Sequence, residues 1–296
     1  MRSVLAAAML LTAWASDAAP AEPVRVMTFN VRYGTAPDGE NRWERRREML
    51  LGVIANFDPD VLGVQEALRD QIDAIGEALP ALACVGVGRE TDGGGEYSAI
   101  FYRRKRFDLM AAETFWLSDT PKTPGSRTWG NNLPRICTWA RLLDRTDSRR
   151  FTVFNTHWDH QSQPARVASG VLMGARVAEC TAAGEPALVT GDFNSVENSP
   201  AMIGLCKRGE LLRDTYRDVH PDEVIGTAHA FTGLAVGKID AILATADWQV
   251  VEADIARTQA EGRYPSDHFP VTAVVELKKE AMGSNANRPE RTRLGP

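Results

Sequence analysis

Short apolar runs recur along the chain, and several of them end on an acidic, amide or imidazole side chain. The stretches "PVRVMTFNVRYG" at 23–34 and "DPDVLGVQEA" at 58–67 carry apolar residues on both sides of the strand pleat. Such runs are typical of strands that are buried on both faces. The pattern predicts a strand-rich core with polar groups at the ends of its strands.

Helical patterns separate these runs, with apolar residues recurring at the spacings of three and four that an amphipathic helix requires. We predict helices over 43–57, 68–79, 165–182 and 199–212. Further strands are predicted over 82–88, 97–103, 107–117, 136–144, 151–158, 187–190, 238–244, 248–256 and 268–277. Because the composition does not change abruptly before residue 278, we predict one domain over 20–277 in which two helical layers cover the strands.

The two ends of the chain differ from this body. Arg2 precedes the uncharged run "VLAAAMLLTAW" and then small residues, which is the pattern of a secretory signal peptide cleaved after Ala18 or Ala19. The apolar run is too short to span a bilayer, which takes about 20 residues, and no later segment is long enough. We therefore expect a signal peptide over 1–19, a secreted or periplasmic monomer with no transmembrane segment, and a disordered tail over 278–296.

The charge of the chain bears on its partners. A net charge of −5 at pH 7 argues against tight nonspecific binding of nucleic acid, which relies on neutralisation of phosphates by Lys and Arg. It does not exclude a nuclease, because a bound divalent metal would supply local positive charge. The basic clusters at 103–106 and 149–150 are more typical of solvated hairpin ends.

The four cysteines show no metal-binding spacing, since none forms a CxxC pair and none has a neighbouring His. Export would permit a disulfide. Cys180 and Cys206 lie in neighbouring helical patterns and are the candidate pair, with buried free thiols as the alternative.

The stretch "VTGDFNSVENS" at 189–199 places Asp192 and Asn194 two residues apart, directly after an apolar run. Gly, Asp, Asn and Ser all favour turns, so on its own this stretch predicts a turn. The alternative is a catalytic carboxylate and amide at the end of a sheet. Other strands end on residues of the same kind, namely Asn30, Glu66, His157, Asp240, Asp267 and His268.

Six motifs that occur in this order resemble those of the endonuclease/exonuclease/phosphatase superfamily of DNase-I-like phosphohydrolases: "MTFNVRYG", "GVQEA", "NTHWDH", "GDFN", "KIDAIL" and "YPSDHFPV". The resemblance covers about residues 24–277. The intervening "DGENRW", "GGGEYSAIFY", "TFWLS" and "LPRICTWAR" look most like a secreted bacterial branch that is largely uncharacterised. The resemblance implies an α/β fold, a four-layer αββα sandwich of two packed mixed β-sheets flanked by helices.

The resemblance also implies a metal site. Glu66 matches the main Mg²⁺ carboxylate of the family, and Asn30 and Asp267 would complete or support the metal shell. Mg²⁺ suits such a site because it takes oxygen ligands and retains waters, and Mn²⁺ is the expected substitute. From the residues alone, Glu66 could equally be an acid that stabilises a helix N-terminus.

Catalytic roles follow from the same resemblance. Asp192 matches the carboxylate that orients or deprotonates the attacking water, and Asn194 would bind a phosphate oxygen or the metal shell. His268 matches the imidazole that binds a phosphoryl oxygen, and Asp240 would fix its tautomer, although Asp240 could also be structural. Weaker assignments are His157 with Glu96 as its carboxylate partner, and Arg135, His229, Asp159 and His160 as substrate contacts.

The function expected from these residues is a secreted, Mg²⁺-dependent phosphoesterase. It would hydrolyse a phosphodiester or a phosphomonoester by in-line attack of an activated water. A nuclease acting on DNA or RNA and a sphingomyelinase-like phospholipase are the alternatives. A non-catalytic binding module is disfavoured, because every matched metal and phosphate position carries the expected residue type.

Overall fold

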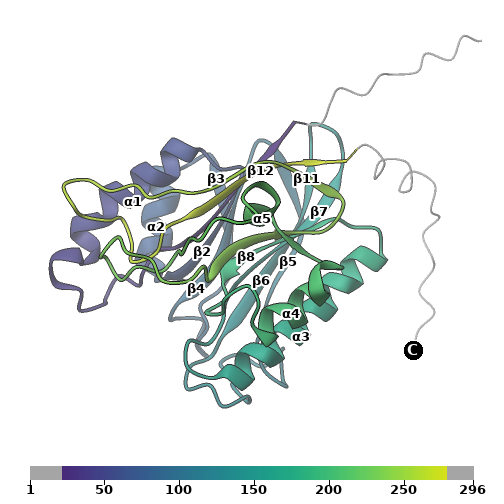
Figure 1. Ribbon diagram of the computed structural model, residues 1–296, viewed down its shortest axis with the longest axis horizontal. Helices are drawn as coiled ribbons and strands as arrows, with labels where there is room; N and C mark the ends of the chain where they lie inside the picture. Colours follow the sequence, from purple (N-terminus) through teal and green to yellow (C-terminus); the bar gives the residue numbers. More distant parts are fainter. Residues whose placement is uncertain (1–21, 279–296) are drawn as a thin grey trace, which may run out of the picture.

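Two six-stranded mixed β-sheets pack face to face in the computed structural model, which describes residues 22–278 (Figure 1). The first sheet has the order β11 (Trp248–Ile255), β12 (Val271–Leu277), β1 (Val24–Asn30), β2 (Val61–Ala67), β4 (Tyr97–Arg103) and β3 (Leu82–Val85). The second has the order β5 (Phe107–Trp116), β6 (Ile136–Asp144), β7 (Arg150–His157), β8 (Ala187–Asp192), β10 (Asp240–Ala244) and β9 (Arg213–Asp214). The pairs β1–β2 and β7–β8 are parallel. The predicted signal peptide and the predicted tail after residue 278 lie outside the described residues.

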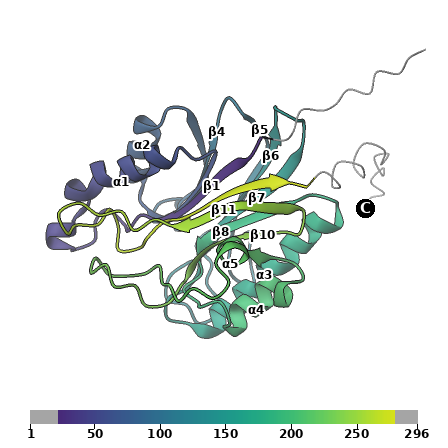
Figure 2. The same ribbon diagram turned by 45° about the horizontal axis from the view of Figure 1, so that its top comes forward.

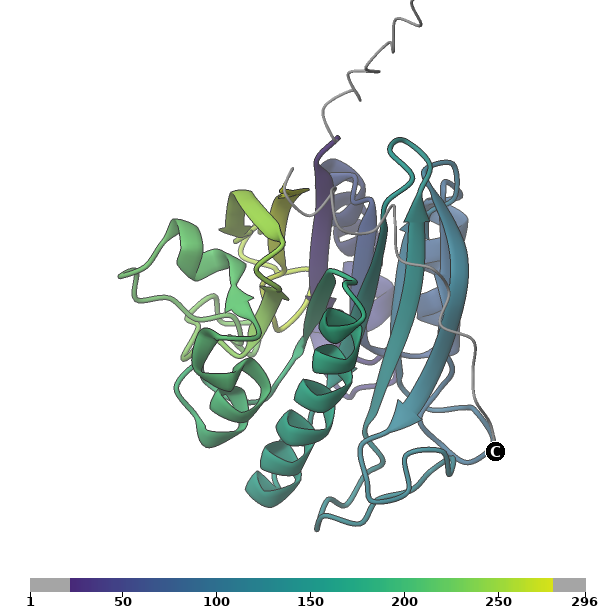
Figure 3. The same cartoon turned by 90° about the vertical axis from the view of Figure 1, so that its right-hand side faces the viewer.

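Helices cover the outer faces of both sheets. The helices α1 (Trp43–Phe57) and α2 (Arg69–Ala78) lie on the first sheet, and α3 (Gln163–Ala182) and α4 (Pro200–Cys206) lie on the second (Figure 2). The long α3 packs along the outside of its sheet (Figure 3). The four-layer αββα sandwich is therefore confirmed. None of the helices within residues 22–278 has the length and apolarity needed to cross a membrane.

The strands are apolar on both sides because each side faces a different core. Val26 of β1 and Leu188 of β8 point into the core between the two sheets. Their neighbours Met27 and Val189 point outwards, onto the helices. Since successive side chains of a strand alternate between its faces, an unbroken apolar run is what a central strand of this sandwich requires.

One predicted element of the region after β8 is wrong. The helix predicted over 199–212 ends at Cys206, because Lys207 adopts a left-handed conformation with a φ of 47° and is followed by the 3-10 turn Lys207–Gly209. The short elements β9 and α5 (Thr215–Val219) follow this turn along the chain. The candidate pair Cys180 and Cys206 is not bonded, and both are free thiols.

The basic cluster at 103–106 is not merely solvated, as the sequence suggested. Arg106 is buried and binds Asp144 at 3.0 Å and Asp60 at 2.8 Å, and Arg103 binds Asp60 at 2.6 Å. Asp60 precedes β2 and Asp144 ends β6, so Arg106 ties the two sheets together. Burial of these charges is tolerated because each has a partner.

Candidate active site

A cavity of about 580 Å³ lies where the carboxyl ends of β1, β2, β7 and β8 meet. Its wall contains nine residues that the sequence singled out: Glu66, Glu96, Arg135, His157, His160, Asp192, Asn194, Asp267 and His268. Asn30 and Asp240 are buried and bind residues of this wall. Because parallel strands end at the same edge of a sheet, side chains far apart in the chain converge here.

Glu66 reaches the cavity because its strand bulges. The register of β2 against β4 shifts between Val64 and Ala67, and Glu66 has a φ of 62°, which is unusual for a residue other than glycine. A bulge turns a side chain out of the regular alternation of a strand. Its Oε1 accepts a hydrogen bond from Asn30 Nδ2 at 3.1 Å, and its Oε2 accepts one from the N–H of Tyr33 at 3.2 Å. Backbone strain of this kind points to a functional position.

Asn30 joins acidic residues that belong to the two different sheets. Its Nδ2 donates to Glu66 and, at 2.9 Å, to Asp192 Oδ2. Its Oδ1 accepts from the backbone N–H of Arg32 at 3.0 Å, which turns the amide nitrogen toward the acids. Asn30 therefore orients the Glu66 carboxylate. In a metal site it would support the ligand Glu66 and would not itself bind the cation.

Asp192 is a buried carboxylate with a perturbed acidity. Its Oδ1 accepts from the N–H of Asn194 at 2.9 Å and its Oδ2 accepts from Asn30. Burial, with the charge of nearby Asp240 adding to it, raises the pKa of Asp192 to about 7. A carboxylate with a pKa near neutrality is suited to taking a proton from water.

The turn after Asp192 is built as the sequence predicted. Asn194 has a φ of 46°, a left-handed conformation that Asn tolerates well, and its Nδ2 donates to the carbonyl of Trp158 at 3.0 Å. Phe193 packs edge-on against Trp158 with the ring centroids 5.0 Å apart. The turn therefore directs Asp192 and Asn194 toward the cavity, while Phe193 packs inside the protein and holds the turn in place.

His268 is paired with Asp240 through a hydrogen bond of 2.8 Å between Nδ1 and Oδ2. Burial disfavours the charged imidazole, but the charge and hydrogen bond of Asp240 outweigh it and raise the pKa of His268 well above its ordinary value. With Nδ1 bound to Asp240, Nε2 is the nitrogen left to donate to a ligand. The pair agrees with the arrangement that the sequence predicted.

His157 lies between two carboxylates without a close bond to either. Its Nε2 is 3.5 Å from Asp192 Oδ2, and its Nδ1 is 3.9 Å from Glu96 Oε2. Burial, with the nearby charges of Arg135 and Arg89, lowers the pKa of His157 well below its ordinary value, so the imidazole is neutral at pH 7. Burial raises the pKa of Glu96 to about 7 although Arg89 binds it at 2.6 Å.

The weaker candidates Arg135, His160 and Asp159 lie together. Arg135 Nη2 is 2.8 Å from His160 Nδ1, and Arg135 Nε is 3.6 Å from Asp159 Oδ2. Asp159 also accepts hydrogen bonds from the backbone N–H groups of Gln161 and Ser162, just before α3. Arg135 and His160 thus line the cavity, whereas Asp159 shapes the loop behind them.

His229 has a packing position in this structure. Its ring stacks on Phe269 with the centroids 4.0 Å apart, and its Nδ1 accepts from the N–H of Gly233 at 3.3 Å. Burial, with the positive charge of His268 as the next cause, lowers the pKa of His229 to about 4. The neutral ring supports the loop that ends near Asp267 rather than forming part of the cavity wall.

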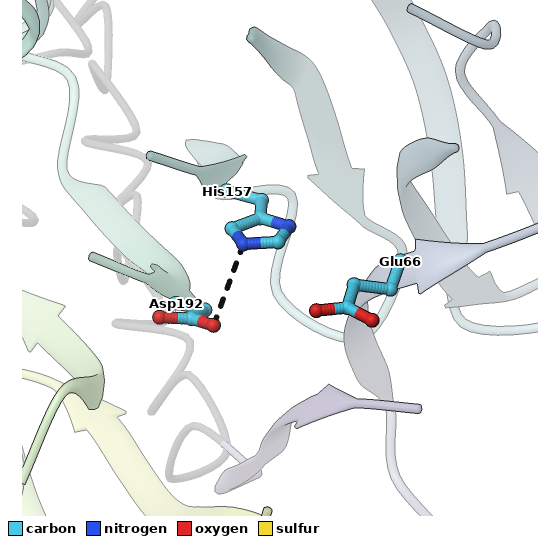
Figure 4. Close-up of side chains that lie close together, drawn as sticks. All are labelled: Glu66, His157 and Asp192. Carbon is cyan, nitrogen blue, oxygen red and sulfur yellow. Dashed lines mark ion pairs between the residues drawn. The ribbon is translucent and has the colours of Figure 1, made fainter. Parts of the chain in front are cut away.

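The acidic side of the cavity has donors that fit a divalent cation. Glu66, His157 and Asp192 offer ligand atoms that lie within 4.8 Å of one another, and Figure 4 shows their side chains converging. Burial raises the pKa of nearby Asp267, and the charge of Glu66 adds to this effect. Mutual repulsion of buried carboxylates is relieved when a hard cation binds them. A second set, Asp192 with Asp240 and His268, is less suited, because the bond between Asp240 and His268 already uses Nδ1.

Sequence reasoning missed four residues of the cavity wall: Arg32, Tyr33, Arg89 and Leu133. Arg32 binds Asp38 at 2.9 Å and lies 3.7 Å from Asp267. Arg89 belongs to none of the motifs. The one feature of the sequence that could have indicated its pairing with Glu96 is that it lies seven residues before Glu96, across a loop with three consecutive glycines.

A second cavity, of about 600 Å³, lies beside the buried Lys238. The ammonium of Lys238 is paired with Asp214 and lies 3.5 Å from Glu197, so this charge is neutralised within the protein. Near this cavity, Val224 is 99% exposed and Val236 is 87% exposed. The sequence pattern did not predict an apolar surface there. The catalytic residue types converge in the first cavity instead.

Comparison with known proteins agrees with this site. The profile of the Endonuclease/Exonuclease/phosphatase family matches residues 27–268. The chain is similar to a solved protein of that family from Bacteroides thetaiotaomicron, with 30% identity, a TM-score of 0.80, and coverage of 87% of this chain and 99% of that one. It is also similar to a mannosyl-6-phosphatase of the same species, with 31% identity, a TM-score of 0.79, and coverage of 86% and 100%.

A more distant likeness connects the chain to nucleases. It is 22% identical to a probable RNA exonuclease of Saccharomyces cerevisiae over 66% of this chain, but it spans only 42% of the length of that relative. Members of the matched family hydrolyse phosphate esters and in general depend on a divalent metal. With a profile match over most of its length and two related structures at about one-third identity, the chain belongs to the endonuclease/exonuclease/phosphatase family.

Proposed function

We propose that the protein is a secreted, Mg²⁺-dependent phosphoesterase that hydrolyses its substrate by in-line attack of water. The observation that carries this proposal is the convergence in one cavity of Glu66, the Asp240–His268 pair and Asp192, which is held between Asn30 Nδ2 and the N–H of Asn194. Next to Asp192, Asp240 keeps His268 cationic. A base and a hydrogen-bonding cation side by side are what hydrolysis of a phosphate ester requires.

The reaction follows from the placement of these groups. Asp192 takes a proton from water as the water oxygen bonds to phosphorus, and the bond to the leaving oxygen breaks with its electron pair on that oxygen. His268 donates through Nε2 to a phosphoryl oxygen and offsets the growing negative charge. Asn194 Nδ2 already donates one hydrogen to the carbonyl of Trp158, so its second N–H is the donor available for another phosphate oxygen.

Glu66, with His157 or Asp267 around it, would hold the cation, which leaves Asp192 to act as the base. When bound, Mg²⁺ would stabilise negative charge on the phosphoryl and leaving oxygens. Asn30 and the N–H of Tyr33 keep the Glu66 carboxylate directed into the cavity. The oxygen-rich donor set supports Mg²⁺, with Mn²⁺ as its substitute.

The signal-peptide pattern of residues 1–19 supports export, and both a phosphatase and a nuclease occur among the similar proteins. The experiment that tests the proposal compares p-nitrophenyl phosphate, bis-p-nitrophenyl phosphate, RNA, plasmid DNA and sphingomyelin as substrates. Each is incubated with the purified protein as prepared, after EDTA, and after return of Mg²⁺ or Mn²⁺. We expect turnover of at least one ester that EDTA abolishes and Mg²⁺ restores. Full turnover in EDTA, or no hydrolysis of any ester, would contradict it.

A further inference from the structure

Two buried arginines form the wall of the cavity beside His157. Arg89 and Arg135 are only 7% and 4% exposed, and both line the main cavity. The burial of Arg135, followed by the positive charge of Arg89, lowers its pKa from the ordinary value. Two guanidinium groups this close and this deeply buried need negative charge to offset their desolvation.

Among residues 22–278, three carboxylates lie near the pair, but only Glu96 forms a close hydrogen bond with it. Arg89 has one close carboxylate, Glu96 at 2.6 Å, with Glu90 3.5 Å from its Nε. Arg135 has Asp159 at 3.6 Å, and its closest side-chain partner is the imidazole of His160. The cluster is therefore short of closely bonded acceptors.

The hydrogen bonds of the pair are incomplete as well. Among residues 22–278, Nε and Nη1 of Arg135 and Nε of Arg89 have no hydrogen-bond partner, although all three atoms are buried. Buried donors are nearly always paired, so these atoms need an acceptor from outside the chain, either a water in the small void beside them or an oxygen of a ligand. Guanidinium forks match the oxygens of phosphate and carboxylate groups.

This end of the cavity is also narrow. Arg89, Arg135, Glu96 and His157 line a separate void of only about 10 Å³ behind the main cavity. A void of this size holds about one water molecule. Because Arg89 and Arg135 also line the main cavity, a phosphate bound there would present its terminal oxygens to their guanidinium groups.

We propose that Arg89 and Arg135 form a subsite for the terminal oxygens of a phosphate monoester, which makes this protein select monoesters over diesters. The inference rests on the proposed phosphoesterase function. A monoester has three terminal oxygens and a charge of about −1.5 to −2 at pH 7. A diester has one acceptor oxygen fewer and a single negative charge. A site built from buried donors discriminates strongly against an analogue that leaves a donor unpaired.

The test measures kcat/KM for p-nitrophenyl phosphate and bis-p-nitrophenyl phosphate at pH 8 with saturating Mg²⁺, where the monoester is dianionic. The two substrates share one leaving group. We expect Arg135→Gln and Arg89→Gln to lower kcat/KM for the monoester about 100-fold or more, and for the diester by no more than about tenfold. Arg89→Lys, which keeps the charge but loses the fork, should fall in between and also weaken competitive inhibition by inorganic phosphate.

Arg106→Gln is the matched control, because Arg106 is equally buried but lies outside the cavity. It should lower thermal stability and leave the ratio of monoester to diester activity unchanged. Equal losses on both substrates in the Arg89 and Arg135 variants, or a wild-type protein that prefers the diester, would overturn the inference while the phosphoesterase function stands. Absence of Mg²⁺-dependent hydrolysis of both nitrophenyl esters would overturn the inference, and absence of hydrolysis of RNA, plasmid DNA and sphingomyelin as well would overturn the phosphoesterase function.

Discussion

The two ends of the sandwich both bury charged side chains, but they pair them differently. At the end near Asp60, every guanidinium nitrogen of Arg106 has a partner, with Asp144 at 3.0 Å, Asp60 at 2.8 Å and a backbone carbonyl at 2.7 Å. At the other end, two guanidinium nitrogens of Arg135 have no hydrogen-bond partner within residues 22–278. We call the end with the fully paired Arg106 the closed end, and the end with the incompletely paired Arg135 the open end.

The buried acids show the same contrast. Asp60 is bound by both Arg103 and Arg106. Asp192 accepts only amide hydrogen bonds, lies near Asp240, and has a pKa raised to about 7 by its burial. Charges that hold the sheets together are neutralised by partners within the chain. Charges that remain incompletely paired are those that a cation and a phosphate would complete.

The largest effect on stability is expected from breaking the closed end. Arg106→Gln leaves Asp144 without its ionic partner in a buried setting, so the free energy of unfolding should fall by about 3–5 kcal/mol. Urea unfolding measures this change. The kcat/KM of the protein that remains folded should stay at the wild-type value. Lost activity with unchanged stability would contradict the division of the molecule into these two ends.

At the open end, Glu66→Gln should act on the metal requirement. We expect the Mg²⁺ concentration for half-maximal activity to rise about 10–100-fold, since the Glu66 carboxylate is the proposed main ligand. Metal-free stability should change little, because the substitution removes one charge from an acidic cluster. Glu90→Gln, at an acid 45% exposed, is the control. A large loss of metal-free stability in Glu66→Gln would instead indicate a structural carboxylate.

The smallest effect concerns the pH dependence of stability at the open end. The folded-state pKa of His229 is about 4, below the ordinary value of 6.5, so its stabilising contribution is present above pH 6.5 and is lost as the pH falls toward 4. Asp192 works in the opposite direction, because its pKa is raised. The difference between wild-type and His229→Gln melting temperatures therefore isolates His229. That difference should change between pH 7 and pH 4, and a constant offset would contradict the assignment.

Much of the fold and site could be predicted because strand periodicity and strand-end residues are local signals. The polar residues after each buried run, such as Glu66 and Asp192, mark the cavity directly in the sequence. The bulge that aims Glu66, and the Arg32 N–H that turns the Asn30 amide, depend on contacts between distant segments. For the same reason Arg89 was missed, since its role arises only when its loop meets the end of β7.

The local signal also failed where backbone conformation overrode periodicity. The helical pattern over 199–212 stops at Cys206 because Lys207 is left-handed, which no apolar spacing reveals. The pattern of the basic cluster at 103–106 predicts a solvated surface, but Arg106 reaches Asp60 once the second sheet packs on the first.

Asp192→Asn tests the central claim most directly, because it removes the proposed base while keeping the shape and burial of the side chain. We expect kcat for the best phosphate ester to fall by about 10²–10⁴-fold with Mg²⁺ present. The melting temperature should change little, since the lower cost of burying a neutral amide offsets the loss of one of the two hydrogen bonds that Asp192 accepts. Wild-type turnover in a stably folded Asp192→Asn protein would contradict the assignment of this cavity as the phosphoesterase site.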